Sequence, residues 1–163
     1  MGRPVGRTED CLGDPRLCLC GHLRRAARAV TQVYDEAFQP TGLKATQVSL
    51  LQAAWRQGPS TLNRLAGAVV MDRTTLARNL KPLARLGLVR ISQGADRRSR
   101  EVTVTFSGRK ALLKAYPEWR RAQARMRRRI GGRGFDRLLA SLTAAVEAAR
   151  APARGDGGGR GLP

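Results

Sequence analysis

The stretch from Ser60 to Phe106 decides the expected fold, and it reads STLNRLAGAVVMDRTTLARNLKPLARLGLVRISQGADRRSREVTVTF. Its pattern indicates a short helix, a turn, a longer helix and two strands joined by an arginine-rich loop. Ser60 or Thr61 can cap the short helix, and Asp72 can cap the longer one. This order predicts a winged helix-turn-helix unit, which places its second helix in the DNA major groove with a basic hairpin beside it.

The longer helix is expected to run from Asp72 to Gly87, where glycine is a natural C-terminal stop. Leu76, Leu80 and Leu83 have helical spacing and are expected to face inward. Pro82 removes one backbone hydrogen bond, so we expect a bend that leaves the N-terminal half intact. The strands are expected at 88–91 and 101–106, with a wing from Gly94 to Arg100.

Helical periodicity extends to both sides of this unit. A helix is expected from Leu17 to Phe38, ended by Pro40 and Gly42, and a second one capped by Thr46 and stopped by Gly58. Two more are expected at about 107–129 and 135–150, separated by Gly131 and Gly132. The fold class is therefore mostly α (α+β), with a winged helix-turn-helix at about 44–106.

The helices at about 17–39 and 107–150 carry narrow apolar stripes that need covering. We expect them to form a homodimer interface, and a monomeric helical cap is the alternative. Residues 1–16 are expected to be a flexible arm, and the glycine-rich segment 151–163 a disordered tail.

The formal net charge is +19, and 27 of the 31 basic residues are arginines. A genome-wide preference for arginine could produce this composition, but so could a polyanionic partner. Between Arg56 and Arg100 ten basic residues face only Asp72 and Asp96. Charge of that density favours binding to the phosphate backbone of a nucleic acid.

Several classes are disfavoured. No apolar run is long enough to span a membrane, so we expect a soluble cytoplasmic protein. One histidine, few carboxylates and no phosphate-binding glycine loop indicate no enzyme and no cofactor. The set Cys11, Cys18, Cys20 and His22 is too tightly spaced to favour a tetrahedral metal site, so none is expected.

The chain resembles the MarR family of transcription regulators over roughly residues 18–150. The resemblance is carried by Leu65-Ala66, by 71–76 (MDRTTL), by 86–89 (LGLV), by the Asp96-Arg97-Arg98 wing and by the lead from Val104-Thr105 into Gly108. It implies a homodimer that binds a double-stranded DNA operator, with Asp96 bracing the wing and Arg98 in the minor groove. The DNA-contacting positions that it implies are Arg64, Arg73, Thr74, Thr75, Arg78, Asn79 and Lys81, with Arg97 and Arg100 as phosphate contacts or solvated charge.

Cys18 and Cys20 are expected at the start of the first helix, where the dipole favours a thiolate. The segment resembles the reactive-cysteine context of the family's organic-peroxide sensors, of the OhrR type, in which Tyr34 would match an assisting tyrosine. Two further tyrosine positions fall on Arg24 and Ala45. The alternative is that Cys20 is a small buried core residue.

The residues predict a DNA-binding protein. The family resemblance implies a homodimeric repressor that is released by a small aromatic ligand or by oxidation at Cys20. An architectural protein that coats DNA without sequence preference is the alternative from another class. It would show a steep dependence on salt and little preference between sequences.

Overall fold

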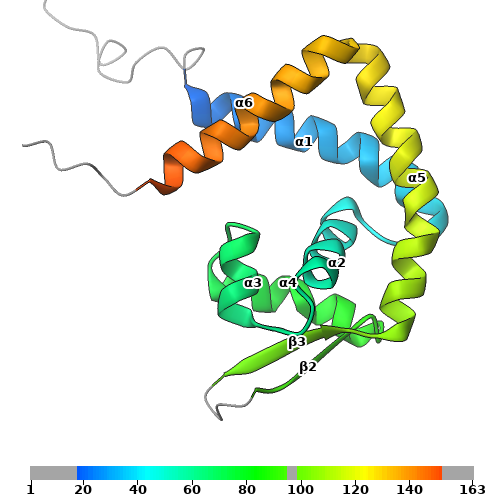
Figure 1. The fold of residues 1–163 in the computed structure, drawn as a ribbon. Coiled ribbons are helices and arrows are strands. Elements are labelled where there is room, and N and C mark those ends of the chain that lie inside the picture. The colour runs from blue at the N-terminus through cyan, green and yellow to red at the C-terminus, as the bar shows by residue number, and fades with distance from the viewer. Residues whose placement is uncertain (1–17, 95–98, 152–163) are drawn as a thin grey trace, which may run out of the picture. The chain divides into compact units, whose positions relative to one another are not determined.

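The computed structural model describes residues 18–94 and 99–151. It divides into two compact units, Met1–Ala122 and Gln123–Pro163. The elements in chain order are α1 (Leu19–Phe38), a 3-10 turn (Gln39–Thr41), α2 (Ala45–Gln57), β1 (Ser60–Thr61), α3 (Leu62–Ala68), α4 (Arg73–Arg85), β2 (Val89–Gln93), β3 (Arg100–Val104), α5 (Phe106–Ile130) and α6 (Gly132–Arg150). Figure 1 shows this order from the blue N-terminal helix to the red end of α6.

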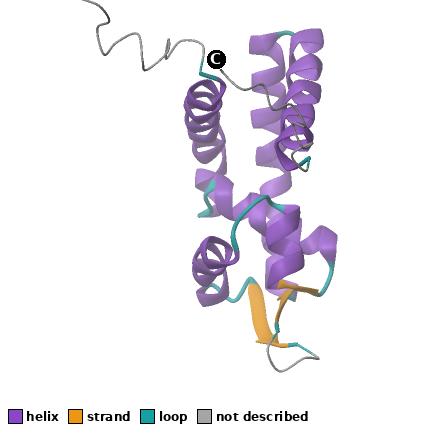
Figure 2. Ribbon diagram, turned by 90° about the vertical axis from the view of Figure 1, so that its left-hand side faces the viewer, coloured by secondary structure: helices purple, strands orange, loops and turns teal. Residues whose placement is uncertain are grey.

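The sheet is antiparallel, with strand order β1-β3-β2. Val89 pairs with Val104 at one end of the hairpin, and Ser60 of β1 pairs with Val102 on the other side of β3. Val102 is fully buried because it lies in the central strand. Figures 1 and 2 show the two longer strands as a hairpin next to α3 and α4, as in a winged helix-turn-helix.

The core of the first unit is built from leucine, as the shortage of aromatic residues requires. Its fully buried side chains are contributed by α1, α2, α3, α4 and β3, and they are Phe38, Leu51, Leu65, Leu76, Leu80, Leu83 and Val102. The inward positions predicted for the longer helix are confirmed. The predicted fold class, mostly α with a winged helix-turn-helix, is confirmed as well.

Two helix caps agree with the sequence prediction. The Thr61 hydroxyl accepts the Arg64 N–H at 3.3 Å, and the Asp72 carboxylate accepts the Thr75 N–H at 2.8 Å. These bonds satisfy amide groups that a helix N-terminus leaves unpaired. They explain why α3 and α4 begin where they do.

The cap predicted for α2 is wrong. Thr46 lies inside the helix, and Lys44 is the N-cap residue, with its N–H donated to the Gln47 side chain at 2.8 Å. The Ala45 N–H is donated to Asp35 of α1 at 2.6 Å. The acceptor at the start of α2 is therefore a carboxylate ten residues earlier in the chain, and not the neighbouring Thr46 hydroxyl that the sequence predicted.

Several boundaries also differ from the prediction. The strand β1 was not expected; its two residues pair only because the chain passes the edge of β3. β2 continues to Gln93, and α6 begins at Gly132, a turn before Phe135, because Gly131 adopts a positive φ of 82° and stands as its N-cap. The helix α4 continues through Pro82, as expected.

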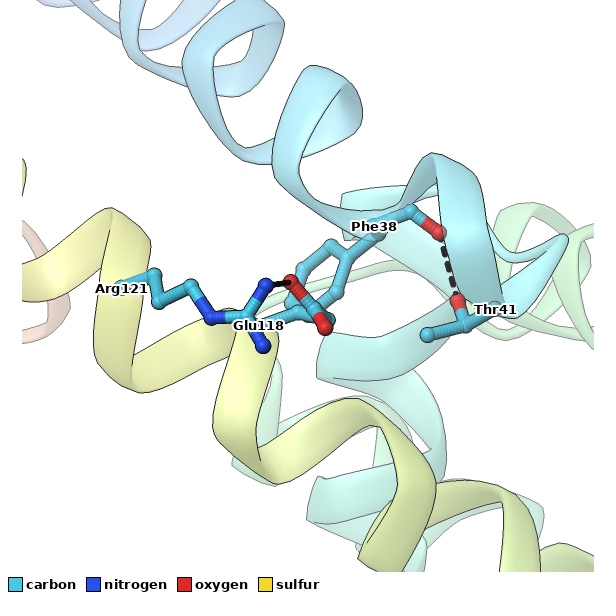
Figure 3. Close-up of polar contacts among 4 residues, drawn as sticks. All are labelled: Phe38, Thr41, Glu118 and Arg121. Atoms are coloured by element: carbon cyan, nitrogen blue, oxygen red, sulfur yellow. Dashed lines mark hydrogen bonds and ion pairs between the residues drawn. The ribbon is translucent and has the colours of Figure 1, made fainter.

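The end of α1 is secured by a local hydrogen bond, which Figure 3 shows. The Thr41 hydroxyl donates to the Phe38 carbonyl at 2.7 Å, and Gly42 follows with a positive φ of 73°. Pro40 lies in the 3-10 turn, so the predicted stop at Pro40 and Gly42 is confirmed.

On α5, Arg121 pairs with Glu118 at 2.9 Å, one turn apart.

In the second unit, α6 has no buried residue among those described. Its apolar side chains at helical spacing are 38 to 49% exposed, namely Leu138, Leu139, Leu142 and Val146. The bidentate pair of Arg127 with Asp136, at 2.6 and 2.9 Å, holds the start of α6 to the end of α5 and lowers the pKa of the Asp136 carboxyl. No helix in the described part of the chain is long and apolar enough to cross a membrane.

Candidate nucleic-acid interface

The outer face of α4 carries a stripe of polar and basic side chains. Leu76, Leu80 and Leu83 are buried, and the helix positions opposite them are exposed. We call these positions the α4 stripe; they are Thr74, Arg78, Lys81 and Arg85. The intervals of four, three and four residues keep all four on one side of a helix.

Arg85 was not among the residues predicted to contact DNA. It stands seven residues after Arg78, which is two helical turns, and it is exposed in the last turn. The same interval separates Thr74 from Lys81. The helical spacing alone could therefore have identified Arg85.

Thr75 lies beside the stripe and belongs to the cap of α4. It is half-buried, and both its N–H and its hydroxyl bond to Asp72. The Thr75 hydroxyl and N–H hold the pKa of the Asp72 carboxyl below its usual range. The charged carboxylate also suits the positive end of the helix.

Asn79 lies at the edge of the buried face. It is half-buried, and its amide Nδ2 lies 3.9 Å from the Met71 sulfur. The structure thus places Asn79 against the turn between α3 and α4, away from the α4 stripe.

The other predicted contact residues are spread over three elements. Arg64 on α3, Arg73 at the start of α4 and Arg100 at the start of β3 are exposed. Arg90 of β2 is exposed too and was not predicted as a contact. The wing residues Asp96, Arg97 and Arg98 lie outside the described residues.

A single threonine joins the end of α4 to the start of α5. The Thr105 hydroxyl donates to the Gly87 carbonyl at 2.6 Å and accepts the Gly108 N–H at 3.0 Å. The bond to Gly108 caps α5, and the bond to Gly87 holds the turn after α4. A change in the direction of α5 would therefore move the turn that follows α4.

The two described cysteines stand at the start of α1. Cys18 is the N-cap residue, and its sulfur accepts the Gly21 N–H at 3.3 Å. Cys20 is exposed, which argues against the buried-core interpretation. Tyr34 lies fourteen residues further along, about 21 Å on a helix, so one chain does not bring it to Cys20. Burial raises the pKa of Tyr34.

Metal ligands do not gather in the described part of the chain. No group of three or more histidine, cysteine or acidic side chains is found there. Cys11, the fourth member of the set considered from the sequence with Cys18, Cys20 and His22, lies outside it.

A cavity of about 250 Å³ opens between α2 and the first half of α5. The Arg109 guanidinium stacks over the Trp55 ring at 4.4 Å, and the rings of Tyr116 and Trp119 are stacked 5.8 Å apart. The cavity is lined by Val48, Gln52, Trp55, Arg109, Leu112, Leu113, Ala115, Tyr116 and Trp119. Among these described lining residues, Arg109 alone carries a charge.

Taken together, the hairpin, the capped α4 and the α4 stripe define a protein of the winged helix-turn-helix class. No family model matches the sequence. The structure is similar to that of the M. tuberculosis transcriptional regulator MosR in complex with DNA, with 44% identity and a TM-score of 0.70, covering 82% of this chain and 98% of that one.

Two further comparisons agree. A MarR-family transcriptional regulator from Rhodococcus sp. RHA1 has a TM-score of 0.67 at 21% identity, covering 86% of this chain and 96% of that one. The uncharacterized HTH-type transcriptional regulator YwoH of Bacillus subtilis is 28% identical over 92 residues, which are 56% of this chain and 67% of YwoH. The chain belongs to the MarR family of transcription regulators.

Proposed function

We propose that this chain is a sequence-specific DNA-binding repressor that acts as a homodimer, with α4 of each subunit in the major groove. The observation that carries the proposal is the α4 stripe, which is exposed opposite a fully buried leucine face. Arginine in the major groove reads guanine through two hydrogen bonds, and lysine holds phosphates. In this arrangement Arg78 contacts a base, and Lys81 and Arg85 contact phosphates of the DNA backbone.

The flanking residues complete the interface. Arg64, Arg73 and Arg90 hold phosphates beside the groove, and Arg100 does so at the base of the wing. Arg98 of the wing enters the adjacent minor groove, where a narrow A-tract attracts an inserted arginine.

A dimer is supported by the uncovered apolar faces at the ends of the chain. The stripe of Leu138, Leu139, Leu142 and Val146 on α6 is exposed in a single subunit, as are Leu19, Leu23 and Val30 on α1. A second copy of the chain is the occupant that matches them, since two copies would read the two halves of a pseudo-palindromic operator. The half-sites would lie about one helical turn apart, ~34–36 Å.

The experiment is a gel-shift titration on the DNA that flanks the protein's own gene, at about 200 mM salt with non-specific competitor. Arg78→Ala is compared with Arg24→Ala, which removes the same charge from an exposed position on α1. We expect a discrete shift for the wild type and for Arg24→Ala, and affinity weaker by about 1–3 kcal/mol for Arg78→Ala.

The competing outcomes are distinct. A smear that competitor abolishes would favour the coating protein over the operator reader. Equal weakening by both substitutions would mean that total charge, and not the α4 stripe, determines the affinity.

A small aromatic acid is the regulatory signal that the α2–α5 cavity supports. Its volume of about 250 Å³ suits one ring with short substituents, and Arg109 offers a guanidinium to a carboxylate. The ligand would lie between α2 of the winged unit and α5, whose start is tied to α4 through Thr105. A ligand that favours one direction of α5 would thus change the placement of α4.

Both tryptophans of the chain, Trp55 and Trp119, line this cavity, so fluorescence reports on it directly. We expect titration with 4-hydroxybenzoate to change the emission of the wild type and of Lys110→Gln, but not of Arg109→Gln. Lys110 is a matched control because it also stacks on a ring, Phe106, at 4.8 Å. Equal binding by all three proteins would contradict the role of Arg109.

Oxidation at Cys20 is the second candidate signal, and the exposure of Cys20 at the start of α1 favours it. A hydroperoxide would convert the Cys20 thiol to a sulfenic acid and be reduced to an alcohol. We expect peroxide to abolish the gel shift of the wild type, thiol reductant to restore it, and Cys20→Ser to be insensitive. A shift that ignores peroxide would leave the aromatic acid as the signal.

A further inference from the structure

The turn between α3 and α4 contains a valine where the backbone geometry favours glycine. The Met71 N–H bonds to the Ala66 carbonyl at 3.0 Å, and the Val70 N–H to the Gly67 carbonyl at 3.4 Å. These two bonds form a Schellman motif, whose left-handed residue here is Val70, at φ 55°. A β-branched residue at positive φ is strained, so the turn needs support from elsewhere in the fold.

The turn that follows α4 provides the comparison. The Leu88 N–H bonds to the Leu83 carbonyl and the Gly87 N–H to the Ala84 carbonyl, both at 2.9 Å. The left-handed residue of that motif is Gly87, at φ 67°. The same geometry is therefore unstrained after α4 and strained before it.

Asn79 contacts the strained turn from inside α4. Its amide nitrogen lies 3.9 Å from the sulfur of Met71, the residue that directly follows Val70, and both side chains are half-buried. Met71 also packs against the hydrophobic core. The Asn79–Met71 contact thus ties the second turn of α4 to the segment that leads into it.

We propose that Asn79 is a positioning residue of the DNA-binding unit, which acts through Met71 to hold the strained turn and thereby the N-terminal end of α4. The inference rests on the proposed DNA-binding function. To read adenine, an asparagine must direct both its amide oxygen and its amide nitrogen to the base edge. In the structure the amide nitrogen of Asn79 faces the Met71 sulfur instead, so the effect of Asn79 on DNA is to set where Thr74 and Arg78 enter the groove.

The test is a double-mutant cycle on operator binding, with Asn79→Ala, Met71→Leu and the double variant. Leucine keeps the volume of methionine and removes the sulfur acceptor. Met126→Leu, at another half-buried methionine, is the control. Each protein is titrated on the operator and on a set of operators with single base-pair changes, at a temperature where circular dichroism shows every variant folded.

We expect Asn79→Ala and Met71→Leu each to weaken operator binding about threefold or more, and the double variant to be no weaker than Asn79→Ala. The preference for the operator over its single base-pair variants should fall to a similar extent at every base pair that α4 contacts. Loss of preference at one base pair in Asn79→Ala, with Met71→Leu unaffected, would make Asn79 a base reader and overturn the inference. Unchanged affinity in Asn79→Ala would overturn it too.

A second measurement needs no DNA. We expect hydrogen exchange of the Met71 amide to be faster in Asn79→Ala than in the wild type, because the turn opens more often. Unchanged exchange would contradict the inference even if the wild type binds its operator. Faster exchange in Asn79→Ala, together with a wild type that gives no discrete gel shift, would instead contradict the proposed DNA-binding function alone.

Discussion

Gly108 is a residue whose missing side chain makes room for another backbone segment. A Cβ placed there would lie in severe overlap with the Leu88 carbonyl oxygen and 2.8 Å from the Val104 side chain. We expect Gly108→Ala to lower the free energy of unfolding by about 1–3 kcal/mol, because the junction between the hairpin and α5 must move. Urea unfolding followed by circular dichroism measures this difference.

Gly67 is the matched control for that substitution. It lies within α3, and a Cβ there would meet nothing within 4 Å. Gly67→Ala should raise the free energy of unfolding by about 0.5–1 kcal/mol, since alanine favours a helix over glycine. A Gly108→Ala variant that is as stable as Gly67→Ala would show that the close approach to Leu88 is unimportant.

Asp72 gives the stability of α4 a dependence on pH. Its pKa is lowered by bonds from Thr75, so it lies below the value in the unfolded chain. The contribution is therefore fully present above about pH 4 and is lost as the pH falls below that value. Asparagine also caps helices but does not titrate, so Asp72→Asn should lose less stability between pH 7 and pH 3 than the wild type does.

Thermal unfolding at the two pH values checks this expectation. The hydrogen bond from Arg127 lowers the pKa of Asp136 as well, and Asp72→Asn leaves that pair unchanged. The difference between the two proteins therefore isolates the α4 cap. An equal loss of stability in both would exclude the cap as a source of acid sensitivity.

At the scale of elements, we expect substitutions in the two Schellman turns around α4 to change the stability in opposite directions. Gly87→Val should lower the free energy of unfolding by about 1–2 kcal/mol, because it places a β-branched residue at φ 67°. Val70→Gly removes the strain of a β-branched residue at positive φ. Glycine, however, loses more conformational entropy on folding, so we expect a net stabilisation of less than about 1 kcal/mol. Denaturant midpoints of both variants test the pair, and a destabilising Val70→Gly would contradict the strain at that turn.

The elements themselves could mostly be predicted from local signals. Thr61 and Asp72 mark the starts of α3 and α4, and Gly58 and Gly87 mark helix ends, because caps and left-handed glycines act within a few residues. The start of α2 was misplaced at Thr46 because its acceptor is Asp35 on another helix. The strand β1 was missed because two residues carry no periodicity, and only pairing with β3 makes them a strand.

At the scale of the whole molecule, we expect that a charge placed in the apolar face of α6 prevents dimerisation. Leu142→Glu places a charge in that face, whereas Ala144→Glu adds the same charge on the opposite side of the helix, where Ala144 is exposed. Sedimentation velocity should show a dimer for the wild type and Ala144→Glu, and a monomer for Leu142→Glu. Monomers in all three samples would remove the dimer from the proposed function.

The distribution of charge predicts how DNA binding depends on salt. Lys81 and Arg85 are expected to neutralise phosphates, so Lys81→Ala should reduce the slope of log K against log salt by about 1. The preference between operator sequences should stay the same, because a phosphate contact carries no base information. Affinities measured between about 50 and 200 mM salt provide both quantities.

The sequence by itself determined the winged helix-turn-helix, the leucine face of α4 and the dense positive charge around it, because periodicity, caps and composition are local properties. Only the tertiary structure decided which polar side chains of α4 have partners within the chain. The Thr75 hydroxyl and N–H bond to Asp72, and the Asn79 amide nitrogen faces the Met71 sulfur. The tertiary structure also gave α2 its acceptor from Asp35 and formed the aromatic cavity between α2 and α5. These features join residues that are apart in the chain, and their positions depend on how the core packs.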